Sequence, residues 1–253
     1  MKNPKKHILI TGASSGIGAA IAQNYAKDGH ILYLSGRNKD RLSEIGEICE
    51  SLGAYVNTKV IDVTDQMQMR GWISSLSHLD IVIANAGIAI GDISPRDHDY
   101  EDTARTIFDV NLNGVLNTIH PAIDLMRAKG GSISVVSSLA GYRGLPTAPA
   151  YSASKAAVKA YAEALSPSLK SIDIHLSVVF PGFVKSRITD RNKFPMPFFM
   201  TAEKASDIIT SRIEAKKTII AFPWQMRLIS WFFRTLPSGW ALKILSLSKE
   251  EKG

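Results

Sequence analysis

Two residues spaced one helical turn apart, Tyr151 and Lys155, have side chains that could together transfer a proton. Side chains four residues apart lie on the same face of a helix. A free tyrosine has a pKa of about 10, and a nearby ammonium group stabilises the phenolate and lowers that pKa. The pair could then exchange a proton with a substrate oxygen. Because this spacing is common by chance, the alternative is an ordinary surface helix with an exposed lysine and a half-buried tyrosine.

A serine thirteen residues before Tyr151 is a candidate for holding the substrate oxygen. Ser138 directly follows a predicted strand, residues 132–137. Ligands of open α/β sheets bind outside the carboxyl ends of the strands, where the Ser138 hydroxyl could donate a hydrogen bond. Ser137 is a weaker candidate for the same role.

A polar residue, Asn111, falls inside a long predicted helix, residues 104–128. Asparagine has a poor intrinsic preference for helix interiors, which suggests a specific role. Its amide could bind a water that connects Lys155 to solvent. The alternative is a buried amide whose hydrogen bonds are satisfied locally.

A glycine-rich turn follows the first predicted strand and opens the first predicted helix. Gly12 would permit a tight turn, Gly16 would let the backbone approach a pyrophosphate, and Gly18 would allow close helix packing. The amides at the start of the helix would attract the anion. The alternative is an ordinary strand–helix turn. The stretch reads Thr11-Gly12-Ala13-Ser14-Ser15-Gly16-Ile17-Gly18.

The residue after the second predicted strand is a cation, Arg37, at the place where sites that prefer NAD have an acidic residue. The nearest acid, Asp40, already belongs to the next predicted helix. A guanidinium group can bind a phosphate with two parallel hydrogen bonds. This turn therefore predicts NADP(H), with Arg37 on the 2′-phosphate, and the alternative is a solvated loop arginine.

Apolar runs alternate along the chain with longer amphipathic stretches, which favours a doubly wound parallel sheet in an α/β protein. We expect one Rossmann-type domain over residues 1–215 and a C-terminal helical extension over residues 216–253. The predicted strands are residues 7–10, 31–35, 55–61, 81–84, 132–137 and 175–180, and the predicted helices are residues 17–28, 41–52, 66–76, 104–128 and 150–166.

Together these residues resemble the classical short-chain dehydrogenase/reductase family, colinearly from about Lys6 to Ser186. The resemblance implies a catalytic set of Asn111, Ser138, Tyr151 and Lys155, with Lys155 also on the nicotinamide ribose. It further implies an NADP(H)-dependent oxidoreductase acting on a CH–OH group, and a homodimer or homotetramer. The implied cofactor-binding residues are Gly12, Ser14, Ser15, Gly16, Ile17, Gly18, Arg37, Asp62, Val63, Asn85, Ala86, Gly87, Tyr151, Lys155, Pro181, Gly182, Val184 and Ser186.

Two positions depart from the family pattern. The usual pair of asparagines before Ala-Gly is Ala84-Asn85 here, and the usual threonine near the nicotinamide is Ser186, which keeps a hydroxyl. Residues 194–200, rich in phenylalanine and methionine, lie in the region that covers the substrate in the family, a lid of about residues 187–202. An apolar, adaptable lid favours a hydrophobic carbonyl or alcohol substrate. The alternative is a lid that packs on its own core.

The C-terminal extension is apolar and basic. Residues 224–233 have their polar side chains on one narrow helical stripe, residues 240–247 repeat the pattern, and three of the four tryptophans lie here. Such segments are typical of helices in a membrane interface. Packing against the body or a partner subunit is the alternative. Nucleic-acid binding is not expected, because the extension is too apolar and no motif supports it.

The composition is that of a folded protein, with 45% hydrophobic and 21% charged residues among 253. The single cysteine, Cys49, excludes an intrachain disulfide and fits a reducing compartment. No signal peptide or long apolar segment is evident, and the histidines lack metal-ligand spacing. We therefore expect a cytoplasmic protein without a metal, and the C-terminal extension leaves peripheral association with a membrane open. The competing functions are a non-catalytic NADP-binding regulator and a membrane-docked interaction protein on the same fold.

Overall fold

A seven-stranded parallel sheet forms the centre of the molecule, in the order β3-β2-β1-β4-β5-β6-β7. The computed structural model describes residues 4–89, 100–145, 148–186, 189, 196–237 and 239–240. The strands are β1 (His7–Thr11), β2 (Ile31–Gly36), β3 (Tyr55–Val60), β4 (Ile81–Ala84), β5 (Gly131–Val136), β6 (Ile174–Pro181) and β7 (Ile219–Phe222). This is the predicted doubly wound α/β fold.

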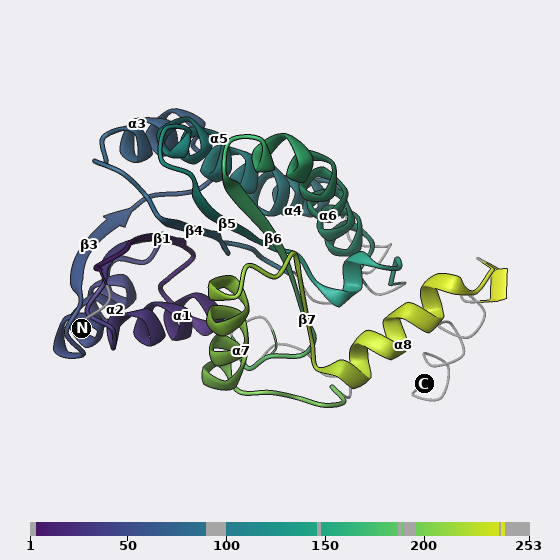
Figure 1. Ribbon diagram of the computed structural model, residues 1–253. Helices are drawn as coiled ribbons and strands as arrows, with labels where there is room; N and C mark the ends of the chain where they lie inside the picture. The colour runs from purple at the N-terminus through teal and green to yellow at the C-terminus, as the bar shows by residue number, and fades with distance from the viewer. Residues whose placement is uncertain are drawn as a thin grey trace.

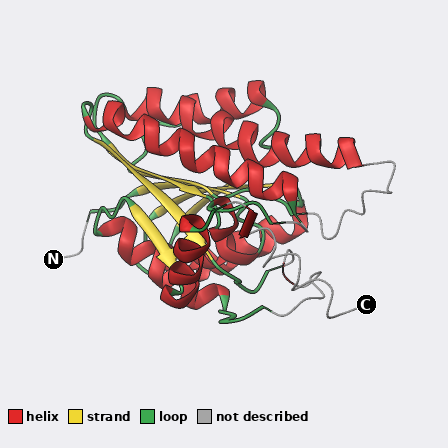
Figure 2. Cartoon of the chain, turned by 90° about the vertical axis from the view of Figure 1, so that its right-hand side faces the viewer, coloured by secondary structure: helices red, strands yellow, loops and turns green. Residues whose placement is uncertain are grey.

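Helices cover both faces of the sheet, as parallel sheets require (Figures 1 and 2). One face packs against α3, α5 and α6, and the other packs against α1, α2 and α7. The helices are α1 (Gly16–Ala26), α2 (Lys39–Ser51), α3 (Gln66–Ser74), α4 (Tyr100–Phe108), α5 (Gly114–Met126), α6 (Pro149–Lys170), α7 (Ala202–Glu214) and α8 (Trp224–Thr235), with a π-helical turn at Asp109–Asn113 and a 3₁₀ turn at Leu139–Gly141.

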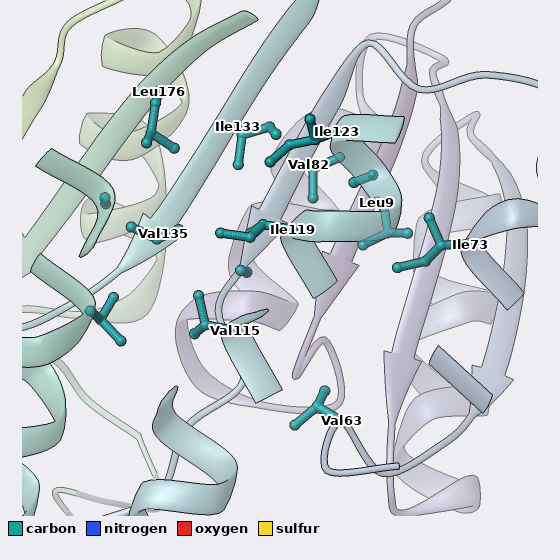
Figure 3. Packing of buried hydrophobic residues seen from close by; sticks show 14 of the residues in the cluster. Leu9, Val63, Ile73, Val82, Val115, Ile119, Ile123, Ile133, Val135 and Leu176 are labelled. Carbon is teal, nitrogen blue, oxygen red and sulfur yellow. The ribbon is translucent and has the colours of Figure 1, made fainter. Parts of the chain in front are cut away.

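Alternate residues of each strand supply the two cores. On β1, Leu9 points to the side of α3 and α5, while Ile8 and Ile10 point to the side of α1 and α2. Figure 3 shows Leu9 and Val82 of the sheet packed against Ile119 and Ile123 of α5. All of these side chains are almost fully buried, and burying each one stabilises the fold by about 1.5–3 kcal/mol.

The order of the strands reverses next to β1. From β1 the chain first adds β2 and β3 on one side, and β4 then pairs with β1 on the other side. The loops that follow β1 and β4 therefore diverge and leave a crevice at the carboxyl ends of these strands. Ligands of such sheets bind at this switch point, so the fold alone places a site beside Gly12 and Asn85.

Two parts of the structure go beyond the predicted elements. Helix α7 and strand β7 were not predicted, and β7 pairs with β6 inside the segment assigned to the C-terminal extension. The part of the extension outside the sheet thus begins with α8, which projects away from the rest of the molecule (Figure 1). The predicted second helical segment, residues 240–247, lies outside the described residues except for Trp240.

Candidate active site

A cavity of about 450 Å³ opens at the carboxyl ends of the central strands. Its walls come from the glycine-rich turn after β1, the ends of β2 to β5, the start of α6 and the segment after β6. Every predicted site residue except Gly18 and Asn111 lines this cavity. The structure therefore brings together residues that are spread over most of the sequence.

The glycine-rich turn forms the floor of the cavity. Gly12 and Gly16 have φ angles of +67° and +55°, which side chains other than glycine rarely adopt. Asn85, at the end of β4, donates its Nδ2 to the Thr11 carbonyl at 3.0 Å and ties this turn to the neighbouring strand. Gly18 lies beneath the turn, where a Cβ would be only 2.4 Å from the Gly12 carbonyl oxygen. It is therefore needed for packing and does not line the cavity.

The start of α1 offers its backbone amides to this cavity. Ser15, the residue before α1, makes no side-chain hydrogen bond to the first turn, and that turn contains no acidic residue. By contrast α2, α3 and α7 are each capped by a side chain, from Asn38, Asp65 and Thr201. An uncapped helix start attracts an anion such as a pyrophosphate.

At the other end of the cavity, the hydroxyl groups of Tyr151 and Ser138 both line the wall. Burial raises the pKa of Tyr151, and the Ser138 hydroxyl acts in the opposite direction. The Ser138 hydroxyl accepts a hydrogen bond from the Ala140 amide at the start of the 3₁₀ turn, and this bond holds the serine side chain in place. Ser137, the weaker candidate, uses its hydroxyl to bind the Lys155 carbonyl at 2.8 Å, so it positions α6.

The Lys155 ammonium lies one helical turn beneath Tyr151, 5.8 Å from the centre of its ring. It donates to the Val136 carbonyl at 2.9 Å and is almost fully buried. Burial lowers the pKa of Lys155 to about 8. At neutral pH the side chain therefore still carries a charge, held next to a phenol that can lose a proton.

A family model described as short chain dehydrogenase matches residues 6–194, which include the glycine-rich turn, Ser138, Tyr151 and Lys155. The chain belongs to the short-chain dehydrogenase/reductase family. It is therefore an oxidoreductase by family.

Relatives of this dehydrogenase span more than one substrate class. An uncharacterized oxidoreductase of Myxococcus xanthus is 33% identical and covers 91% of this chain and 92% of its own length. The 11-beta-hydroxysteroid dehydrogenase 1A of Arabidopsis thaliana is 36% identical over 75% of this chain, which spans 55% of the plant protein. The crystal structure of a 3-ketoacyl-ACP reductase from Sinorhizobium meliloti has a TM-score of 0.78 at 29% identity, covering 88% of this chain and 99% of that chain.

In this dehydrogenase Asn111 lies behind the cavity wall, fully buried in the π-helical turn between α4 and α5. The predicted single helix, residues 104–128, is thus interrupted where the asparagine lies, and π-helical turns often occur at functional sites. Its amide accepts from the Ile88 amide at 2.8 Å and donates to the Ile88 carbonyl and the Ser154 hydroxyl. The amide is therefore hydrogen-bonded on both sides. Asn111 Oδ1 and Lys155 Nζ both border Gly87, each 3.2 Å from a Cβ placed on that residue.

At the end of the cavity below β2 and β3, Arg37 forms an ion pair with Asp62, with Nη1 3.5 Å from Oδ2. The Arg37 side chain is exposed and that of Asp62 is partly exposed. A second cation, Arg41, also lines the cavity, and its buried Nε has no hydrogen-bond partner among the described residues. Sequence reasoning missed Arg41, although a second arginine four residues after Arg37 was a usable signal.

The predicted lid is only partly described, since Phe194 and Pro195 lie outside the described residues. Phe198 and Phe199 are about half exposed and do not line the cavity. Met200 is buried and bonds through its backbone to Phe183 and Lys185, which anchors this end of the lid beside the segment after β6. Thr189, another residue that sequence reasoning missed, lines the cavity and accepts from the Ser186 amide at 2.9 Å.

Proposed function

We propose that the protein is an NADP(H)-dependent oxidoreductase that moves a hydride between nicotinamide and a carbonyl or alcohol carbon of an apolar substrate. The observation that carries the proposal is the single cavity that joins two arginines at one end to the side chains of Ser138 and Tyr151 at the other. One end suits a phosphate and the other suits proton transfer. A dinucleotide is the cofactor class that can reach both.

The residues at the adenosine end favour NADP(H) over NAD(H). No carboxylate follows β2, and Arg37 and Arg41 both line this end. The exposed pairing of Arg37 with Asp62 contributes about 0–1 kcal/mol, whereas a guanidinium on a phosphate makes stronger, charge-assisted bonds. Arg37 can therefore turn from Asp62 to a 2′-phosphate, and the unpartnered Arg41 Nε offers a second donor.

The middle of the cavity suits a pyrophosphate. The uncapped start of α1 supplies amides, and the positive φ angles of Gly12 and Gly16 keep side chains out of the space above them. A Cβ on Gly16 would lie 3.0 Å from the Ser186 Cβ, so the cradle between the two loops exists only because glycine stands there. These features favour a turn that binds a diphosphate over an ordinary strand–helix turn without a ligand.

The nicotinamide of the bound cofactor supplies or accepts the hydride. Tyr151 then donates a proton to the substrate oxygen during reduction, or removes one during oxidation, and Ser138 holds that oxygen with its hydroxyl. The Lys155 charge stabilises the phenolate as the proton leaves, since an ammonium near a phenol favours the ionised form. Asn111 holds Ile88 and Ser154 by hydrogen bonds. Because its Oδ1 borders Gly87, as Lys155 Nζ does, it is the candidate to hold the water of a proton relay.

The substrate class follows from the apolar part of the wall. Ile88, Ala89, Val110 and Val184 line the cavity together with the polar residues already described. Apolar walls with few polar groups are typical of sites for apolar ligands. Ketones and aldehydes on apolar skeletons are therefore the first substrates to screen.

Turnover of a panel of such carbonyls, followed by the loss of NADPH absorbance, tests this function. The proposal expects at least one substrate to be reduced with NADPH, and Tyr151→Phe to keep NADPH binding while losing turnover. NADPH binding without turnover of any carbonyl or alcohol would instead favour a non-catalytic NADP-binding regulator.

A further inference from the structure

Helix α8 presents an apolar face to solvent. Trp224, Leu228 and Trp231 are 67%, 55% and 61% exposed, although each is a large apolar residue. Positions 224, 228 and 231 recur at the spacing of one helix face, so these side chains form a single stripe. Exposed apolar stripes of this kind mark an interaction surface.

The face of α8 opposite the stripe packs against the body of the protein and fixes the orientation of the helix. Met226 packs against the core cluster beneath α5 and α6, and α8 contacts β7 and the 3₁₀ turn that follows Ser138. Met226 lies on the face of the helix opposite Trp224. The stripe therefore points away from the body, and α8 itself projects from the rest of the molecule (Figure 1).

The positive charge around the stripe favours an anionic partner. Between Glu214 and Glu250 the sequence contains six lysines and arginines and no acidic residue. Among them, Arg227 is exposed beside the stripe, and Lys216 and Lys217 are exposed just before β7. Tryptophans next to lysines and arginines suit the boundary between lipid headgroups and acyl chains, and the positive charge is attracted to anionic lipids. Among the described residues no helix is long and apolar enough to span a bilayer.

We propose that the stripe of Trp224, Leu228 and Trp231 docks the protein on the surface of an anionic lipid bilayer. The helix lies in the interface, with the tryptophans between the headgroups and the cations on the lipid phosphates. Helix α8 directly follows Pro223, and the Pro223 Cδ is 3.0 Å from a Cβ placed on the cavity residue Gly182. Docking of α8 therefore brings the part of the cavity near Gly182 close to the bilayer. Where the proposed function holds, an apolar substrate reaches the site from the membrane.

Flotation of the full-length protein with vesicles tests the docking without cofactor or substrate, so its outcome is independent of the proposed function. Vesicles of phosphatidylcholine alone are compared with vesicles that also contain phosphatidylglycerol. We expect binding to the anionic vesicles, with a shift of tryptophan fluorescence to shorter wavelength. Trp224→Ala with Trp231→Ala should lower the bound fraction at least tenfold, and Lys216→Glu with Arg227→Glu should abolish the preference for anionic lipid.

The matched control replaces Tyr55 and Met67 by alanine, since both are large side chains at least as exposed as Trp231 and far from α8 in the sequence. This variant should float like the unchanged protein, and thermal melting shows whether each variant is folded. Two results would overturn the proposal. One is flotation that the tryptophan replacements leave unchanged. The other is an absence of vesicle binding together with an oligomer that dissociates when Trp224 and Trp231 are replaced, which would assign the stripe to a second copy of the chain.

Discussion

Arg37 and Asp62 face each other at the adenosine end of the cavity, with Arg37 Nη1 3.5 Å from Asp62 Oδ2. The two residues follow neighbouring strands, β2 and β3, and both line the cavity. The pairing holds the guanidinium at the place where an adenosine ribose is expected. It also gives the arginine a competing partner, which makes the strength of cofactor binding depend on Asp62.

Replacement of Asp62 by asparagine should strengthen NADPH binding. The change removes the competing charge but keeps Oδ1, which accepts from the Thr64 amide and hydroxyl. An exposed ion pair contributes about 0.2–1 kcal/mol, so we expect roughly 1.4- to fivefold tighter NADPH binding and a smaller effect on NADH. Calorimetric titration of both cofactors checks this, with Asp40→Asn as control. Weaker NADPH binding in the variant would show that Asp62 acts mainly as a cofactor contact.

Replacement of Tyr151 by phenylalanine should remove turnover and leave cofactor affinity nearly unchanged. Without its hydroxyl the ring cannot exchange a proton with the substrate, and general acid–base catalysis typically contributes about 10²–10⁴-fold to the rate. Tyr161→Phe is the matched control, because Tyr161 lies on the same helix and bonds to His120. A Tyr151→Phe variant that keeps more than about a tenth of the turnover would exclude Tyr151 as the proton donor.

Carbonyl reduction should slow as the pH rises above about 8, because burial lowers the pKa of Lys155 to about 8 and its charge is lost there. Below this pH the ammonium is charged and stabilises the developing phenolate. The profile of kcat/KM against pH measures the effect. Lys159→Met, one helical turn further along α6 and paired with Glu163, should leave the profile unchanged. A reduction rate that stays constant through this range would mean that the Lys155 charge has no part in the reaction.

Two glycine-to-alanine replacements should act in opposite directions. At Gly18 a Cβ would lie 2.4 Å from the Gly12 carbonyl oxygen and 2.5 Å from Asn85 Nδ2, so Gly18→Ala should displace the turn, weaken cofactor binding and lower stability by about 1–3 kcal/mol. At Gly71 in α3 nothing lies within 4 Å, and alanine should stabilise the helix by up to about 1 kcal/mol. Thermal melting and NADPH titration distinguish the two. Equal melting temperatures would contradict the tight packing beneath the turn.

The sequence predicted most of the fold because the strands of the central sheet are apolar on both faces and the glycine-rich turn has a defined context. One of the two elements that it missed, strand β7, depends on a distant contact. Strand β7 has only four residues and exists through its pairing with β6, which no local pattern reveals. Helix α7 is introduced by a Thr201 cap, a signal that was present but not used. The predicted helix 150–166 continues through Pro167 to Lys170, because Leu169 is buried in the core and holds the last turn.

In the candidate site, too, local sequence patterns were predictable and contacts between distant residues were not. Residues in motifs with strict spacing, such as Tyr151 and Lys155, could be named in advance. Arg41 was missed although its spacing from Arg37 was a usable signal, because its place on the cavity also depends on how Asn38 caps α2 and directs the first turn of that helix. The π-helical turn at Asn111 could not be predicted from the sequence either, since Asn111 bonds there to the distant residues Ile88 and Ser154.

Titration with NADPH and NADH, repeated after Arg37→Ala, tests the central assignment most directly. The account predicts tighter binding of NADPH than of NADH, and a loss of roughly ten- to a hundredfold in NADPH affinity in the variant, since charge-assisted hydrogen bonds contribute about 1.5–3 kcal/mol. NADH affinity should change little, and Arg127→Ala should affect neither cofactor. Equal affinity for the two cofactors, or an Arg37→Ala variant that binds NADPH like the unchanged protein, would contradict the account.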